Sequence, residues 1–244
     1  MDGLPMCHKH QGDRFYVRNC YSEYYKTIAS LFNGTARDSI QKDYLTVTGT
    51  PGIGKSIFYI YFFQRWMREN PRSVLVTAAF TRDRMLKSCR VFRNSLSEPV
   101  KRSTIPDIDG ALYLYDGAPD VEPDEAKMVC FTSPNISWLD SIDHAPDHKV
   151  LFMPPWTLDE LQEAVYLLDR QFFPKIPIME DRLALVAERF NTVGGSARYC
   201  LQFEELIYAD ERALNNFRVQ FLSVSNILDQ IFLITYRNQT RHPS

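Results

Sequence analysis

The stretch that decides the fold is LTVTGTPGIGKSIFYIYFFQRW, residues 45–66. A run of β-branched and apolar residues leads into GTPGIGKS, and a long series of aromatic and apolar residues follows it. GTPGIGKS fits the phosphate-loop pattern G-x-x-x-x-G-K-[ST], and it has the strand before and the helix after that the pattern requires. We therefore predict a nucleotide site made of these eight residues: Gly49, Thr50, Pro51, Gly52, Ile53, Gly54, Lys55 and Ser56.

The chemistry of this loop follows from its backbone. Successive N–H groups and the N-terminus of the next helix bind a diphosphate, and side chains at the glycine positions would block the anion. We expect Lys55 to reach the β and γ phosphates of ATP as a point charge. The Ser56 hydroxyl is the expected protein ligand of Mg²⁺, together with waters and phosphate oxygens.

The pattern of apolar residues predicts an α/β fold. Near-continuous apolar runs are typical of strands in a parallel sheet that is covered on both faces. A first helix is expected over 15–32 and a buried crossover helix over 55–70. The first helix carries its apolar positions at helical spacing and should stop at Asn33-Gly34; these positions are Val17, Tyr21, Tyr24, Tyr25, Ile28 and Leu31. The predicted strands are 44–48, 73–80, 111–116, 128–133 and 149–154.

After Pro155 the pattern becomes helical. Thr157 and Glu160 have the spacing of a capping box at the start of a helix. Further helices are expected over 179–190 and over roughly 195–209, with Gly194-Gly195 ending one helix and Ser196 capping the next. The predicted organisation is a lead-in region (1–43), a P-loop NTPase core with a parallel sheet (44–155) and a helical lid subdomain (156–244).

Asp116 ends the third predicted strand, LYLYD. We expect this strand to lie next to the first one, so that the Asp116 carboxylate positions Mg²⁺ through water. Many NTPases of this kind place a glutamate directly after that aspartate to polarise the attacking water, but Gly117 stands here. Asp120 and Glu122 are the candidate substitutes, and the alternative is that both are solvated loop acids.

The fourth predicted strand runs into FTSPN, next to the strand of Asp116. Ser133 and Asn135 are therefore candidates for contacting the γ-phosphate and the attacking water. The alternative is an ordinary Ser-Pro-Asn turn.

Arg198 is expected in the first turn of a helix. A cation there opposes the helix dipole, so local helix stability does not explain it. We predict a lid arginine that reaches the phosphates, against the alternative of a surface or ion-paired arginine.

The composition of the chain limits which binding partners are expected. The chain has 244 residues, 45% of them apolar, and a formal net charge of -2, so no global field attracts nucleic acid or an anionic membrane. A basic stretch from Arg82 to Arg102 could present an arginine to a neighbouring subunit or contact a phosphate backbone, and the alternative is a solvated face. His8, Lys9 and His10 show no third metal ligand.

Five scattered cysteines without a C-x-x-C pair indicate reduced thiols and an intracellular protein. The N-terminus has no apolar segment of a signal peptide, and no run approaches the length of a membrane span. We expect no membrane partner.

Taken together, these motifs resemble the P-loop NTPase domain of Crinkler effectors and the related retrotransposon hot spot proteins. The resemblance rests on six segments spread over residues 15–201: YVRNCYSEYY, VTGTPGIGKSIFYIYFFQRW, LYLYDGAP, FTSPNISWL, MPPWTLDEL and VGGSARYC. It implies an AAA+/STAND-like fold, with Asp116 as the Walker B aspartate, Arg198 as the lid arginine, and Trp138 and Trp156 as packing residues.

The resemblance also implies a setting. Crinklers are delivered into host cells, often to the nucleus, and a nuclease or kinase-like toxin domain follows their NTPase domain. No Leu-rich header and no toxin domain are found here, so we expect a fragment or a stand-alone NTPase.

The function expected from these residues is Mg²⁺-dependent ATP hydrolysis, with Lys55, Asp116, Arg198 and Asp120 as catalytic candidates. The alternative is a nucleotide-dependent switch or assembly module with negligible hydrolysis, which the missing glutamate after Asp116 supports. A GTPase is disfavoured because the chain has no N-K-x-D motif, and a small-molecule kinase stays open. Beyond ATP, the expected partner is a second copy of the chain or a host protein.

Overall fold

The structure, a computed structural model, divides the chain into two compact units, Met1–Pro155 and Trp156–Ser244. It describes residues 4–7, 14–33, 43–94, 96–100, 104–120, 122–123, 126–143, 148–168, 173 and 176–201. His8, Lys9, His10, Lys101, Arg102 and everything after Leu201 lie outside the described residues.

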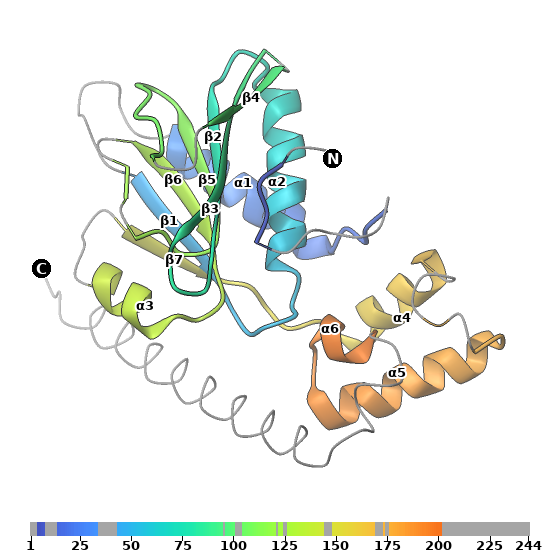
Figure 1. Ribbon diagram of the computed structural model, residues 1–244. Coiled ribbons are helices and arrows are strands. Elements are labelled where there is room, and N and C mark those ends of the chain that lie inside the picture. Colours follow the sequence, from blue (N-terminus) through green and yellow to red (C-terminus); the bar gives the residue numbers. More distant parts are fainter. Residues whose placement is uncertain are drawn as a thin grey trace, which may run out of the picture. The chain divides into compact units, whose positions relative to one another are not determined.

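The first unit contains a seven-stranded, mostly parallel sheet in the order β4-β3-β2-β5-β6-β1-β7 (Figure 1). The pairs β2–β5, β5–β6, β6–β1 and β1–β7 are parallel, and β3 and β4 add an antiparallel edge. The α/β class and the five predicted strands are confirmed. The strands are β1 (Asp43–Thr48), β2 (Leu75–Phe80), β3 (Leu86–Arg93), β4 (Leu96–Val100), β5 (Leu112–Asp116), β6 (Lys127–Phe131) and β7 (His148–Phe152).

The position of the Asp116 strand corrects one prediction. β5 does not lie next to β1, because β6 pairs with both of them. Val47, Phe131 and Asp116 are in register across these three strands. All three strands are almost wholly buried, so their apolar runs carry no signal for which two are neighbours. The expectation that the fourth predicted strand, β6, lies beside the strand of Asp116 is confirmed.

Two helices lie on one face of the sheet, α1 (Asn19–Asn33) and α2 (Lys55–Glu69) (Figure 1). Phe58 and Phe62 of α2 pack on Phe131 of β6, with ring centroids 5.5 and 6.0 Å apart. This confirms the prediction of a buried crossover helix. The prediction that Val17 belongs to the apolar face of the first helix is wrong, because Val17 precedes α1 and is 46% exposed.

On the opposite face of the sheet lies α3 (Ile136–Asp143), which the sequence did not predict. Trp138 of α3 is buried as expected for a packing residue, and its Nε1 donates to Thr46 Oγ1 at 3.1 Å. Successive strand residues point to opposite faces, so Thr46 faces α3 while its neighbour Val47 faces α2.

The second unit contains α4 (Leu158–Leu168), α5 (Met179–Val193) and α6 (Ala197–Cys200). The predicted capping box at the start of α4 is confirmed. The Thr157 N–H donates to Glu160 Oε2, and the Glu160 N–H donates to Thr157 Oγ1, both at 3.1 Å. Gly194 caps the C-terminal end of α5, with a φ of 71°. Trp156 is buried, as expected of a packing residue.

The last helix differs from its prediction. The Ser196 side chain makes no capping hydrogen bond to α6. Ser196 contributes its carbonyl instead, which accepts from the N–H groups of Tyr199 and Cys200. Within the described residues of the chain, no helix is long and apolar enough to cross a membrane.

Candidate functional site

The loop between β1 and α2 has the backbone that its glycines predict. Gly49, Gly52 and Gly54 have φ values of 146°, 82° and 100°, which side-chain-bearing residues rarely adopt. A Cβ at position 49 would lie 2.5 Å from Ile53 Cδ1 and 2.9 Å from the Met153 carbonyl oxygen. Gly49 is therefore needed both for its conformation and for its close packing.

Lys55 lies inside this loop. Its side chain is buried, and the ammonium group donates to the carbonyls of Gly49 at 2.7 Å and Thr50 at 2.9 Å. A buried ammonium group is costly unless it is hydrogen-bonded, and the loop supplies the acceptors. The positive charge of Lys55 is therefore held in place by backbone carbonyls of the loop.

Ser56 and Asp116 are brought together from positions 60 residues apart. Ser56 Oγ, in the first turn of α2, donates to Asp116 Oδ1 at 3.2 Å, and Asp116 is 3% exposed at the C-terminal end of β5. Both residues were predicted as Mg²⁺-positioning groups. A hydroxyl and a carboxylate suit an ion that takes few protein ligands and keeps waters and phosphate oxygens.

An N-terminal segment, residues 4–7, also contacts the Asp116 carboxylate. The Cys7 N–H donates to Asp116 Oδ2 at 2.7 Å, and Lys87 Nζ donates to the Cys7 carbonyl at 2.6 Å. Tyr59 of α2 donates its hydroxyl to the buried Pro5 carbonyl at 2.8 Å. Burial raises the pKa of the Cys7 thiol, and the nearby Asp116 charge adds to this while Lys87 opposes it. Four residues of ordinary loop composition gave no sequence signal for this placement.

Gly117 occupies the position where many P-loop NTPases carry a glutamate. Its φ is 107°, and a Cβ there would lie 3.0 Å from the Phe80 carbonyl oxygen. The Gly117 N–H also donates to the Phe131 carbonyl at 2.9 Å. The backbone at this position is therefore built for glycine, and a side chain would be strained.

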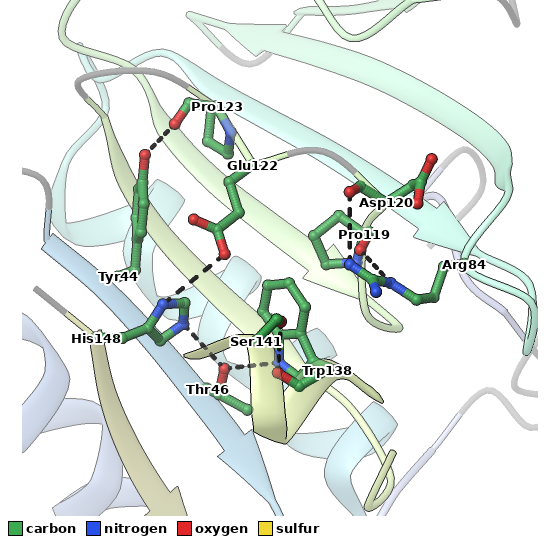
Figure 2. A network of polar contacts seen from close by, with 10 residues as sticks. All are labelled: Tyr44, Thr46, Arg84, Pro119, Asp120, Glu122, Pro123, Trp138, Ser141 and His148. Carbon is green, nitrogen blue, oxygen red and sulfur yellow. Dashed lines mark hydrogen bonds and ion pairs between the residues drawn. The ribbon is translucent and has the colours of Figure 1, made fainter. Parts of the chain in front are cut away.

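The two candidate substitutes for that glutamate have other surroundings. Asp120 is exposed, and its carbonyl accepts from Arg84 Nη2 at 3.4 Å, beside the Pro119 carbonyl that accepts from Arg84 Nε at 2.7 Å (Figure 2). Arg84 itself has a positive φ of 65°. The contacts of Arg84 fix the backbone of the loop after Gly117 without engaging the Asp120 carboxylate.

Glu122 belongs to a polar cluster on the α3 side of the sheet. Its Oε1 lies 3.9 Å from His148 Nδ1, and His148 Nε2 lies 3.3 Å from Thr46 Oγ1 (Figure 2). Burial lowers the pKa of His148 to about 4, so its ring is neutral near neutral pH. Thr46 faces α3, and Glu122 reaches the same face through His148. Asp116 is in register with Val47, which faces α2. Glu122 is therefore directed to the sheet face opposite Asp116.

Ser133 and Asn135, the two residues predicted to contact the γ-phosphate, have different surroundings. Asn135 Oδ1 accepts from the Trp138 N–H at 3.1 Å and from Ser137 Oγ at 2.7 Å, which makes Asn135 the N-cap of α3. Ser133 is exposed directly after Thr132, whose N–H donates to the Val47 carbonyl at 3.0 Å. Ser133 thus follows β6, the strand that lies between β1 and the strand of Asp116. Capping gives Asn135 a structural role, and contact of Ser133 or Asn135 with a phosphate stays a prediction.

Arg198 is exposed in α6 of the second unit, and its contact with phosphates stays a prediction. The basic stretch uses several donors within the chain. Besides Arg84 and Lys87, Arg90 Nη1 donates to Ser97 Oγ at 3.1 Å across the β3–β4 pair. Contact of this stretch with nucleic acid or with a neighbouring subunit also stays a prediction.

Comparison with protein-family models and with curated proteins gives no match for this chain. Within the part of the chain that the structure describes, no three His, Cys, Asp or Glu side chains cluster as a metal site. The functional assignment therefore depends on the geometry of the phosphate loop and Asp116.

Proposed function

We propose that this protein is a P-loop NTPase that binds Mg²⁺-ATP at residues 49–56. The observation that carries the proposal is the 3.2 Å hydrogen bond between Ser56 and Asp116, formed beside a loop whose lysine is held inside it. A strand, a glycine-rich loop and a helix N-terminus together suit an anion site. The Asp116 carboxylate at the end of β5, which β6 separates from β1, would add the metal-positioning group.

Each residue then has a role. Backbone N–H groups of the loop bind the phosphates, and Lys55 places its charge against the β and γ phosphates. Ser56 and Asp116 would hold and orient Mg²⁺, which neutralises phosphate charge when it is bound. Ser133 is the proposed contact for the terminal phosphate, and Arg198 is the proposed lid arginine.

Slow hydrolysis, and hence a switch or assembly module, is favoured by the environment of Gly117. A side chain at the position after Asp116 would be strained, and Glu122 is directed to the other face of the sheet. The protein would then leave bound ATP largely unhydrolysed. The resemblance to Crinkler-type NTPase domains would place it inside host cells as part of an effector.

Equilibrium binding of a fluorescent ATP analogue, with and without Mg²⁺, tests the proposal. We expect Lys55→Ala to raise Kd at least about tenfold, because hydrogen bonds to charged groups contribute about 1.5–3 kcal/mol. Asp116→Asn should remove the Mg²⁺ dependence of Kd. Lys26→Ala is the matched control, because it removes an exposed lysine paired with Glu23 on α1. No Mg²⁺-dependent binding by the wild-type protein would refute the proposal.

Single-turnover hydrolysis separates the enzyme from the switch. A wild-type rate above that of Asp116→Asn identifies an ATPase, and equal rates identify a switch. Light scattering with and without ATP, in wild type and Arg198→Ala, then tests whether nucleotide drives assembly.

A further inference from the structure

Two residues contact the phosphate loop from outside: Arg18, directly before α1, and Tyr21, in its first turn. Arg18 Nη1 donates to the Ile53 carbonyl at 3.2 Å, and the Tyr21 hydroxyl donates to the Gly54 carbonyl at 2.9 Å. Both side chains are buried, with Arg18 2% and Tyr21 0% exposed. Both belong to the YVRNCYSEYY segment, to which the proposed function gives no role.

The Arg18 guanidinium also holds the chain that follows β7. Nη1 donates to the Pro154 carbonyl and Nη2 to the Pro155 carbonyl, each at 2.9 Å. The preceding residue, Met153, donates its N–H to the Thr48 carbonyl at 2.8 Å, just before the loop. The Arg18 side chain therefore ties the loop to the segment 153–155, whose first residue, Met153, lies against Gly49.

These contacts fix the direction of the loop's N–H groups. In a planar trans peptide the C=O and N–H point in opposite directions. Holding the Ile53 and Gly54 carbonyls on the α1 side therefore turns the N–H groups of Gly54 and Lys55 away from α1. The Gly54 carbonyl also accepts from the Phe58 N–H at 2.8 Å, so the first turn of α2 is set by the same peptide.

We propose that Arg18 and Tyr21 are positioning residues that hold the phosphate loop in its anion-binding conformation before nucleotide arrives. The inference rests on the proposed function and deepens it: the ligand class is a nucleoside di- or triphosphate whose β-phosphate meets preoriented N–H groups. Arginine suits this role because its planar fork keeps its charge and donates in several directions at once. Preorganisation raises affinity because the loop does not lose conformational freedom on binding.

Tyr21→Phe is the most selective perturbation. The Tyr21 ring packs on Phe58 and Tyr61, with centroids 5.1 and 5.7 Å away, and phenylalanine keeps these contacts while removing the hydroxyl. Tyr25→Phe is the matched control. Tyr25 is a buried tyrosine of the same helix, and its hydroxyl donates to Glu69 Oε2 at 2.6 Å, at the far end of α2 from the loop.

The assay is ADP and ATP binding by calorimetry, with thermal unfolding of each variant. We expect Tyr21→Phe to raise Kd about threefold to tenfold, which is the worth of one hydrogen bond. Arg18→Lys should raise Kd at least tenfold, because lysine keeps the positive charge but lacks the planar guanidinium that donates several hydrogen bonds at once. Tyr25→Phe should lower Tm about as much as Tyr21→Phe and leave Kd unchanged. Equal Kd values for wild type, Tyr21→Phe and Arg18→Lys would overturn the inference.

Hydrogen exchange of the nucleotide-free protein separates this inference from the proposed function. Loss of the hold on the loop should speed amide exchange in peptides covering 49–58 for Tyr21→Phe and Arg18→Lys, but not for Tyr25→Phe. If these variants exchange faster than wild type but wild type binds no nucleotide, both the proposed function and the positioning role are refuted. The contacts of Arg18 and Tyr21 would then be only structural. Unchanged exchange together with wild-type binding would refute the positioning role alone.

Discussion

Replacing Gly117 tests why no glutamate follows Asp116. At φ 107° an alanine lies outside the left-handed helical region that other residues occasionally enter, and such a conformation costs about 1–3 kcal/mol. The added Cβ would also lie 3.0 Å from the Phe80 carbonyl oxygen and 3.2 Å from Phe80 Cβ. Phe80 is buried in β2, so it has little room to move.

Gly110→Ala is the matched control for this substitution. Gly110 has a φ of 68°, in the left-handed helical region, and a Cβ there would meet no atom within 4 Å. It should therefore cost about 1 kcal/mol, the conformational part alone. We expect Gly117→Ala to cost about 2–4 kcal/mol, the sum of a less favourable φ and the contact with Phe80.

Thermal and urea unfolding measure both variants. At about 2–4 °C per kcal/mol, Gly117→Ala should lower Tm by roughly 4–16 °C and Gly110→Ala by only a few degrees. Gly117→Glu should be destabilised at least as much as Gly117→Ala and should not raise single-turnover ATP hydrolysis. A Gly117→Glu protein that is as stable as wild type and hydrolyses ATP faster would refute the reasoning that the backbone excludes a glutamate.

Three further outcomes are expected. Burial lowers the His148 pKa from 6.5 to about 4, so the unfolded chain binds more protons between these values, and stability should fall as pH drops from about 6.5 to 4. The loss in the free energy of unfolding is at most about 3 kcal/mol. It should be absent in His148→Gln, so the Tm of this variant should change less with pH between 6.5 and 4 than that of wild type. Parallel plots of Tm against pH for the two proteins would contradict this. Asn135→Ala should cost about 1 kcal/mol in urea unfolding by removing the cap of α3, and no loss would argue against the capping role. Tyr59→Phe should cost about 1 kcal/mol and speed proteolysis near residues 4–7, because the Pro5 carbonyl loses its donor; unchanged cleavage would argue against this anchor.

The sequence predicts the fold well where one pattern has one structural meaning. The run GTPGIGKS between a strand and a helix predicts the loop, and Thr157 with Glu160 predicts the capping box that forms. Strand order is beyond such patterns: buried strands all read as apolar runs, so the insertion of β6 between β1 and the Asp116 strand leaves no local trace.

The parts of the candidate site that the sequence did not predict come from residues distant along the chain. The bond from Cys7 to Asp116 spans 109 positions, and the bonds from Arg18 to Pro154 and Pro155 span 136 and 137. Tyr21 was predicted only as an apolar position of a helix, because its ring follows helical spacing while its hydroxyl partner, the Gly54 carbonyl, is a backbone atom. Backbone acceptors have no residue type, so no motif marks them.

Under the proposed function, nucleotide binding and ATP turnover would depend on different parts of this site. Lys55 holds the phosphate loop from within and Arg18 and Tyr21 hold it from outside, by hydrogen bonds that do not involve the loop after Asp116. That second loop is fixed instead by Gly117 against Phe80 and by the contacts of Arg84 with the Pro119 and Asp120 carbonyls. Under the proposed function, the hydrolysis rate would change with the second loop while nucleotide affinity stays high. A ligand or neighbouring subunit that displaced Arg84 would therefore change turnover without changing Kd.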